Sequence, residues 1–69
     1  MTLDNYSRIQ LVTDYYQHNG IPAGTVGYII EVYGDTAYEV EFSDQSGTTV
    51  AQLVVKQDEV ELAEELLSD

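Results

Sequence analysis

The stretch GTVGYIIEVYGDTAYEVEF, residues 24–42, decides the fold of this 69-residue chain. It contains two runs in which apolar residues alternate with acidic or polar ones, YIIEVY at 28–33 and YEVEF at 38–42. An alternation with a period of two is typical of β-strands that bury one face. The short segment between the runs begins with glycine and aspartate, which predicts a tight turn. The stretch is therefore predicted to form a β-hairpin.

The apolar residues of the two runs predict the register of this hairpin. Pairing Gly34 with Tyr38 closes a three-residue loop at 35–37. Four apolar side chains then point inward in two facing pairs, Val32 with Val40 and Ile30 with Phe42. Because side chains alternate between the faces of a sheet, a slip of one residue would turn all four to solvent.

The same register gathers glutamates on the outer face of the hairpin. Glu31 is predicted to lie opposite Glu41, with Glu39 one step along the same face. Like charges that face each other across strands are destabilising. We therefore interpret this acidic ridge, with Tyr33 beside it, as a candidate surface for binding a partner.

Composition narrows the class of partner. Two basic residues, Arg8 and Lys56, stand against 13 acidic residues, and the formal net charge is −11. Such a charge repels nucleic acids and membrane surfaces and attracts basic proteins. We expect a basic protein partner, no direct contact with nucleic acid, and no membrane association.

The same composition bounds the stability and location of the chain. A hydrophobic content of 43% is ordinary for a folded domain, and without cysteine neither a disulfide nor a thiolate metal site is possible. No apolar run approaches the roughly 20 residues of a membrane span, and no signal peptide is recognised. We expect a soluble cytoplasmic protein.

Further strands are predicted on both sides of the hairpin. RIQLVT at 8–13 reads as a strand with Ile9 and Leu11 on one face, and DYYQHNGIP at 14–22 reads as a loop. TTVAQLVV at 48–55 reads as the next strand, after a turn at 43–47. We expect its inward set to be Ala51, Leu53 and Val55, because this leaves Gln52 outside, with Val50 and Val54 as the alternative.

The acidic end of the chain predicts a short helix over residues 58–69. Asp58 and Glu61 have the spacing of a capping box, and Val60, Ala63 and Leu67 follow at helical spacing. A short strand at 59–61 before the helix is also compatible with the pattern. The apolar side of the helix would pack on the core or form a homodimer seam. Its acidic residues would extend the ridge: Asp58, Glu59, Glu61, Glu64 and Glu65.

Four to five short strands predict an all-β fold, a small SH3-like barrel at 8–57 followed by the helix, in a single domain over 1–69. The first hairpin strand is apolar on both faces around Ile29. A long strand that bends between two packed sheets explains this, and Gly24 or Gly27 would permit the bend. An open meander with a docked helix is the alternative.

No catalytic or metal site is expected. Glu39 and Glu41 lie about 7 Å apart on one strand face, a separation known in inverting glycosidases, but so small a domain leaves little room for a substrate cleft. His18 lies beside a turn without converging partners, and the loop at 44–47 lacks the spaced oxygen ligands of a calcium site. No cofactor is implied.

The adjacent tyrosines Tyr15 and Tyr16 suggest that one caps the core while the other is exposed. Exposed tyrosines are good interface anchors, so Tyr16 and Tyr33 are included in the candidate binding surface. A groove for proline-rich peptides is less well supported, because the chain has no tryptophan.

Two resemblances bear on these residues. Gly24-Thr25-Val26-Gly27 followed by an apolar strand is similar to the motif of KOW-type SH3-like domains, whose RNA-binding surfaces are basic, unlike this chain. Residues 8–61 more closely resemble an uncharacterised bacterial family, domain of unknown function 4926. The matching residues are Gly24, Gly27, Glu31 to Tyr33, Tyr38 to Phe42 and the turn from Asp44 to Gly47.

The second resemblance implies a small barrel, and it implies an antitoxin or immunity role because the family is similar to small proteins encoded beside putative toxins. We accordingly expect a non-enzymatic protein that neutralises a toxin or an effector nuclease. Three alternatives stay open: a phage-type inhibitor that imitates nucleic acid, a structural subunit of a larger assembly, and acidity that serves solubility alone.

Overall fold

In the computed structural model, which describes residues 3–44 and 46–63, the chain forms an all-β fold. The strands are β1 (Arg8–Leu11), β2 (Val26–Tyr33), β3 (Ala37–Ser43), β4 (Thr49–Lys56) and β5 (Val60–Leu62). Two 3-10 turns, η1 (Gln17–Asn19) and η2 (Gln57–Glu59), connect them. The strands form one antiparallel sheet in the order β4-β3-β2-β1-β5.

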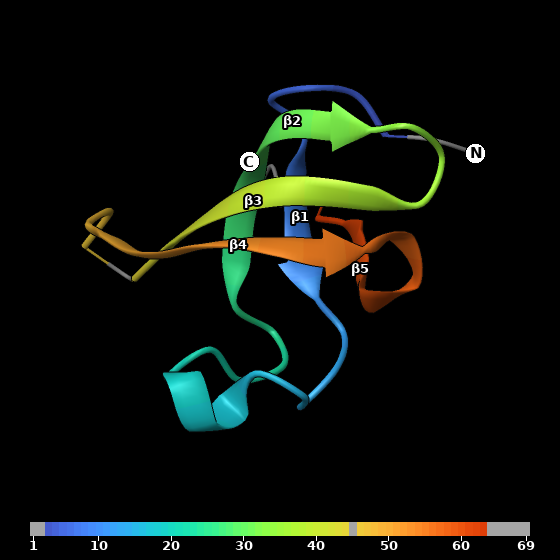
Figure 1. Cartoon of the computed structure of the whole chain (residues 1–69). Coiled ribbons are helices and arrows are strands. Elements are labelled where there is room, and N and C mark those ends of the chain that lie inside the picture. The colour runs from blue at the N-terminus through green and yellow to red at the C-terminus, as the bar shows by residue number, and fades with distance from the viewer. Residues whose placement is uncertain (1–2, 45, 64–69) are drawn as a thin grey trace.

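Strand β2 belongs to both halves of this sheet. Its first residues pair with β1, and most of its length pairs with β3. Figure 1 shows β2 curving from its place beside β1 to run along β3, so that β3 and β4 cross in front of β1. The expected bend is therefore present. The pairing with β3 shifts between Ile29 and Glu31, which places a bulge at Ile30 rather than at either glycine.

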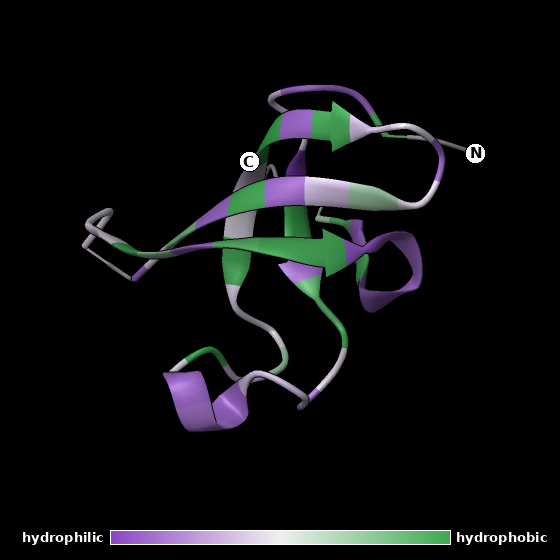
Figure 2. Ribbon diagram, viewed as in Figure 1, coloured by the Kyte–Doolittle hydropathy of each residue, from purple (hydrophilic) through white to green (hydrophobic). Residues whose placement is uncertain are grey.

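The core lies between the two halves of the curved sheet. Strand β3 alternates strictly, and Figure 2 shows it banded in purple and green. Its residues Tyr38, Val40 and Phe42 are buried, each contributing about 1.5–3 kcal/mol of burial free energy. The other buried apolar side chains come from β1, β2, β4, β5 and the loop before β2: Ile9, Leu11, Ile21, Ile29, Val55 and Val60.

The predicted faces of the outer strands are confirmed. Ile9 and Leu11 are buried while Val12 is exposed. On β4, Val55 is buried and Ala51 and Leu53 pack against the core, whereas Val50 and Val54 are 49% and 55% exposed.

The predicted register of the central hairpin is wrong. The loop is residues 34–36, and Tyr33 pairs with Ala37. Val32 lies opposite Tyr38, and Ile29 rather than Ile30 takes the buried place, opposite Val40. The extra residue at the bulge moves the side chains of the preceding β2 residues to the opposite face of the sheet. A strict two-residue alternation cannot predict this change.

Gly27 explains how β2 and β3 approach each other so closely. It lies opposite Phe42, and a Cβ atom there would stand 2.7 Å from the Glu41 carbonyl oxygen and 2.9 Å from Phe42 Cδ1. The two strands therefore approach each other closely at this glycine. Any larger residue would have to push the two strands apart.

The helix predicted over 58–69 is wrong as far as residue 63, and residues 64–69 lie outside the described part of the chain. Residues 57–59 form η2, and Val60–Leu62 form β5 on the free side of β1. The Glu59 carbonyl accepts a hydrogen bond from Val12 N at 2.8 Å, and Ala63 N donates to the Arg8 carbonyl at 2.9 Å. Pairing with β1 satisfies backbone groups that a helix would have left open. The sheet therefore extends beyond residue 57, where the barrel was expected to end, as far as Leu62.

Over residues 3–44 and 46–63, the structure has no helix of the length and hydrophobicity that a membrane span requires.

Candidate functional site

One face of the β2, β3 and β4 half of the sheet points away from the core, and we call it the outer face. It carries three rows of side chains. Pairing across the strands defines the rows as Tyr28-Glu41-Gln52, Glu31-Glu39-Val54 and Tyr33-Ala37-Lys56. The predicted gathering of Glu31, Glu39 and Glu41 on one face is thus present, although Glu31 faces Glu39 and not Glu41. Opposed carboxylates on neighbouring strands repel each other.

Hydrogen bonds hold two of these carboxylates in place. Tyr33 Oη donates to Glu39 Oε1 at 2.6 Å, and Gln52 Nε2 donates to Glu39 Oε2 at 2.5 Å. Thr49 Oγ1 donates to Glu41 Oε2 at 3.0 Å. Each donor is neutral, so the carboxylates are oriented without losing their charge. A surface prearranged in this way has less side-chain entropy to lose when a partner binds.

The Tyr33–Glu39 contact also sets the protonation of both groups. The hydrogen bond from Tyr33, and then that from Gln52, hold the pKa of the Glu39 carboxyl below its ordinary value. The same bond raises the pKa of the Tyr33 hydroxyl, with the Glu39 and Glu31 charges adding to the effect. At neutral pH the carboxylate is charged and the tyrosine keeps the proton that it donates.

Neither basic side chain neutralises the ridge within the described part of the chain. Arg8 Nη1 donates to the Ala63 carbonyl at 3.3 Å, on the far side of β2 in the strand order. Lys56 lies at the end of the third row, opposite Ala37. The outer face is therefore acidic over two rows and is bordered by a basic residue at two places, Lys56 in the third row and Arg8 opposite Tyr28 at the β1 end of the first row.

Two aromatic residues flank the carboxylates. Tyr28 and Tyr33 are 42% and 44% exposed and lie in the first and third rows. Sequence reasoning selected Tyr33 but missed Tyr28, as it missed Val54 and Gln52 at the β4 side. Tyr28 and Glu31 are three residues apart, and only the bulge at Ile30 brings them to one face. The available signal was that YIIEVY has apolar residues at both even and odd positions, so that they cannot all lie on one face of a regular strand.

Tyr16 is not the exposed anchor that the sequence suggested. It packs against the core and its hydroxyl donates to Glu59 Oε1 at 2.8 Å, while Tyr15 is 69% exposed. Burial, followed by the contact with Glu59, raises the pKa of Tyr16 to about 12. The expectation that one of the two tyrosines caps the core is confirmed, and Tyr16 is that tyrosine.

The acidic residues near the C-terminus that the structure describes, Asp58, Glu59 and Glu61, do not share the rows of the outer face. Glu59 also accepts from the Lys56 backbone N–H at 2.8 Å, and Glu61 accepts from Gln10 Nε2 at 2.6 Å on the β1–β5 side of the sheet. Asp58 is exposed on η2. Glu64 and Glu65 lie outside the described residues.

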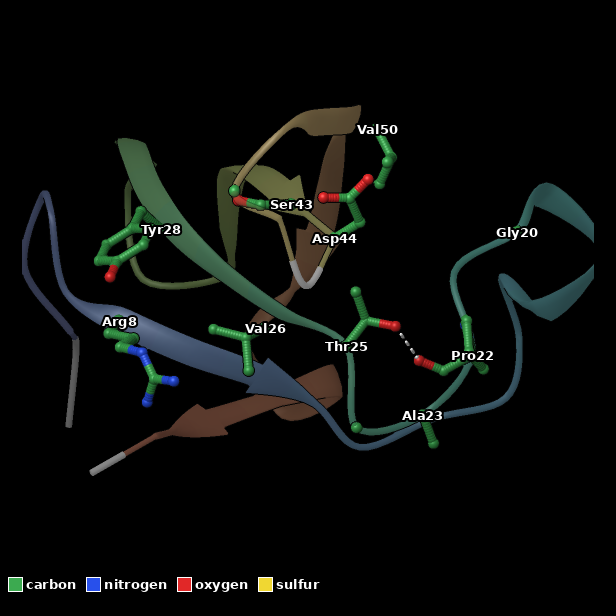
Figure 3. Close-up of a pocket in the computed structure, with 12 residues that line it drawn as sticks. Arg8, Gly20, Pro22, Ala23, Thr25, Val26, Tyr28, Ser43, Asp44 and Val50 are labelled. Atoms are coloured by element: carbon green, nitrogen blue, oxygen red, sulfur yellow. Dashed lines mark hydrogen bonds between the residues drawn. The ribbon is translucent and has the colours of Figure 1, made fainter. Parts of the chain in front are cut away.

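A shallow groove of about 720 Å³ borders the outer face at Tyr28. Figure 3 shows Arg8 and Tyr28 at one end and Pro22 and Ala23 at the other. Its one acidic side chain, Asp44, accepts hydrogen bonds from Ser46 N, Ser46 Oγ and Thr48 N, which lower the pKa of the carboxyl. Asp44 thus closes the turn before β4, as the sequence predicts, and is not directed at a ligand.

Nothing in residues 3–44 and 46–63 assembles three potential metal ligands, and His18 lies exposed on η1. The arrangement of the outer face, with oriented carboxylates between partly exposed tyrosines, is suited to recognition of a cationic surface.

Comparison with known proteins identifies the family of this chain. The family model described as "Domain of unknown function (DUF4926)" matches residues 5–62, and the chain belongs to that family. No curated protein and no solved structure matches the chain.

Proposed function

We propose that this member of the DUF4926 family binds a basic protein through the outer face and neutralises it, as an antitoxin or immunity protein against a toxin or an effector nuclease. The observation that carries the proposal is the row in which Glu31 faces Glu39, a row that contains no basic side chain, beside Glu41, which is separated from Arg8 by Tyr28. The fold retains this repulsion, and a cationic partner would remove it.

Charge and aromatic residues have separate roles in this proposal. The carboxylates, in a chain of net charge −11, accelerate the encounter with a cationic partner and fix its register. Tyr28 and Tyr33 supply contact area at a small entropic cost. If the partner is a nuclease, the carboxylates occupy the basic cleft that would otherwise hold phosphates.

The architecture is proposed to be an SH3-like barrel. Support comes from β2, which is shared by the β5-β1-β2 and β2-β3-β4 halves, and from the 3-10 turn that precedes the last strand. In such a barrel the outer face of β2–β3–β4 is a rigid platform, which suits an inhibitor that binds without rearrangement.

A charge-matched pair of variants tests the proposal. Glu31→Lys with Glu41→Lys reverses the ridge, whereas Asp4→Lys with Asp14→Lys makes the same change of net charge at exposed residues outside the outer face. Each is immobilised and compared with the wild type for capture of the protein encoded beside it. We expect the wild type and the control to retain the partner and the ridge variant to lose it.

The kinetics give a second measurement. We expect the association rate with the wild type to fall about tenfold between low and high salt, and the ridge variant to lose that dependence. Equal capture by the ridge and control variants would show that the ridge is not the binding surface.

A further inference from the structure

Strand β4 ends the sheet, and one of its sides is unpaired in the described part of the chain. It pairs with β3 along its length, from Thr49–Ser43 to Lys56–Ala37, and no other strand lies beyond it in the sheet. Figure 1 shows β4 as the last strand of the front half. An eight-residue strand spans about 26 Å, so its free side offers a long row of backbone donors and acceptors.

This edge lacks most of the features that protect exposed strands from pairing. The run TTVAQLVV at 48–55 contains no charged residue and no proline, in a chain with 13 acidic residues. Figure 2 shows β4 green over most of its length. The opposite edge, β5, is three residues long and carries Glu61. Natural sheets blunt their edges with charges, prolines or short strands, and β5 follows that rule whereas β4 does not.

The outer face indicates what the edge would accept. A strand added to β4 would continue the three rows beyond Gln52, Val54 and Lys56. Its backbone would lie about 10 Å from that of Glu39 and Glu41, which is two strand spacings. Long cationic side chains can cross this gap above Val54, which is short and 55% exposed. Lys56, at the third row, would repel a cation placed opposite it.

We propose that the free edge of β4 accepts an extended segment of a cationic partner as an added strand, with lysine or arginine at alternate positions on the outer face beside Glu39 and Glu41. The backbone ladder supplies affinity, and the glutamate rows select the side chains. Lys56 sets the register, because it favours an acidic or neutral residue in the third row. The inference rests on the proposed function, since it names how the basic partner docks.

A second copy of this chain fits the edge less well. Its own β4 would bring no cation to the glutamate rows except Lys56, and two chains of net charge −11 repel each other. Salt separates the two occupants: it weakens the binding of a cationic strand, whereas it strengthens self-association by screening the repulsion.

The test uses the whole protein and synthetic peptides of about ten residues, the upper end of strand lengths and enough to pair along all eight residues of β4. One peptide has lysine at alternate positions and threonine or valine between them. A second has the same sequence with every backbone nitrogen methylated, so that it keeps its charge but can donate no ladder hydrogen bond from either edge. A third has glutamate in place of lysine. Binding is measured by titration, and exchange of the β4 amides by NMR.

We expect the lysine peptide to bind, with about tenfold weaker affinity at high salt, and to slow exchange of the outward-facing β4 amides. The methylated and glutamate peptides should not bind. The Glu31→Lys, Glu41→Lys variant should bind the lysine peptide weakly, and the Asp4→Lys, Asp14→Lys control should bind as the wild type.

The outcomes separate this inference from the proposed function. Equal binding of the methylated peptide, with no protection of β4, would overturn the edge inference and leave the acidic surface standing. No binding of the lysine peptide, or dimerisation that increases with salt and protects β4, would also overturn it. If the ridge variant captures the protein encoded beside this chain as well as the control variant does, that result would instead overturn the proposed function.

Discussion

At the scale of single residues, Gly27 and Tyr16 each serve a structural role that the sequence only partly indicated. Gly27 lies in β2 where the chain has no room for a side chain, and Tyr16 closes the core from the loop before η1. Each leads to a prediction about stability.

Gly27→Ala is expected to destabilise the fold by about 2 kcal/mol, the typical cost of overpacking. The added Cβ would meet Glu41 O and Val40 Cγ1, both at 2.7 Å. Chemical denaturation measures the loss. Gly34→Ala is the control: its φ of 62° carries a cost of about 1 kcal/mol, but nothing lies within 4 Å of the new atom. A smaller loss at Gly27 than at Gly34 would contradict the close approach.

Tyr16→Phe is expected to cost about 1 kcal/mol at neutral pH, because the hydrogen bond to Glu59 is lost. The substitution should also change how the stability of the fold depends on pH in the alkaline range. The folded state raises the pKa of Tyr16 from 10.0 to about 12, so this contribution is complete below pH 10 and is lost as the pH rises through 12. The thermal midpoint of unfolding should fall more steeply between pH 10 and pH 12 in the wild type than in the variant. Parallel declines would rule out Tyr16 as the cause.

At the scale of the strands, the repulsion between β2 and β3 can be measured directly. Glu31→Lys places a cation opposite Glu39 and should raise the thermal midpoint by a few degrees. Glu41→Lys is the control, because Glu41 lies between Tyr28 and Gln52 and faces no carboxylate. A midpoint that rises equally in both variants would point to net charge and not to the Glu31–Glu39 pair.

The strands also show what the sequence could and could not specify. YEVEF alternates so strictly that β3 and its buried residues were predictable, and Gln52 was enough to orient β4. YIIEVY has apolar residues at both even and odd positions, so its pattern cannot locate the extra residue at Ile30. The sequence therefore predicted that the glutamates share a face, but only the structure shows which of them lie opposite each other.

The C-terminal error has a different cause. VELA fits the spacing of an amphipathic helix and that of a short strand, and Val60 is the residue that each would bury. What decides the matter is the free side of β1, whose backbone groups are satisfied by β5. That requirement arises from residues about fifty positions earlier, beyond the reach of a local pattern.

At the scale of the whole molecule, self-repulsion should oppose folding, because the net charge is −11. We expect the thermal midpoint of the wild type to rise by several degrees when salt shortens the screening length from about 30 Å to about 3 Å. The Asp4→Lys, Asp14→Lys variant carries less charge and should gain less. A midpoint that does not respond to salt would mean that the acidic groups are too far apart to interact.

The place of β1 between β2 and β5 has a consequence for biosynthesis. During synthesis, β1 receives its second neighbour only when Leu62 has left the ribosome, since Ile9 pairs with Leu62. The β2–β3–β4 meander can assemble from neighbouring segments before that, so the nascent chain would present the outer face while its hydrophobic core is still open on one side. Under the proposed function, binding to the acidic rows could therefore begin before β5 completes the sheet.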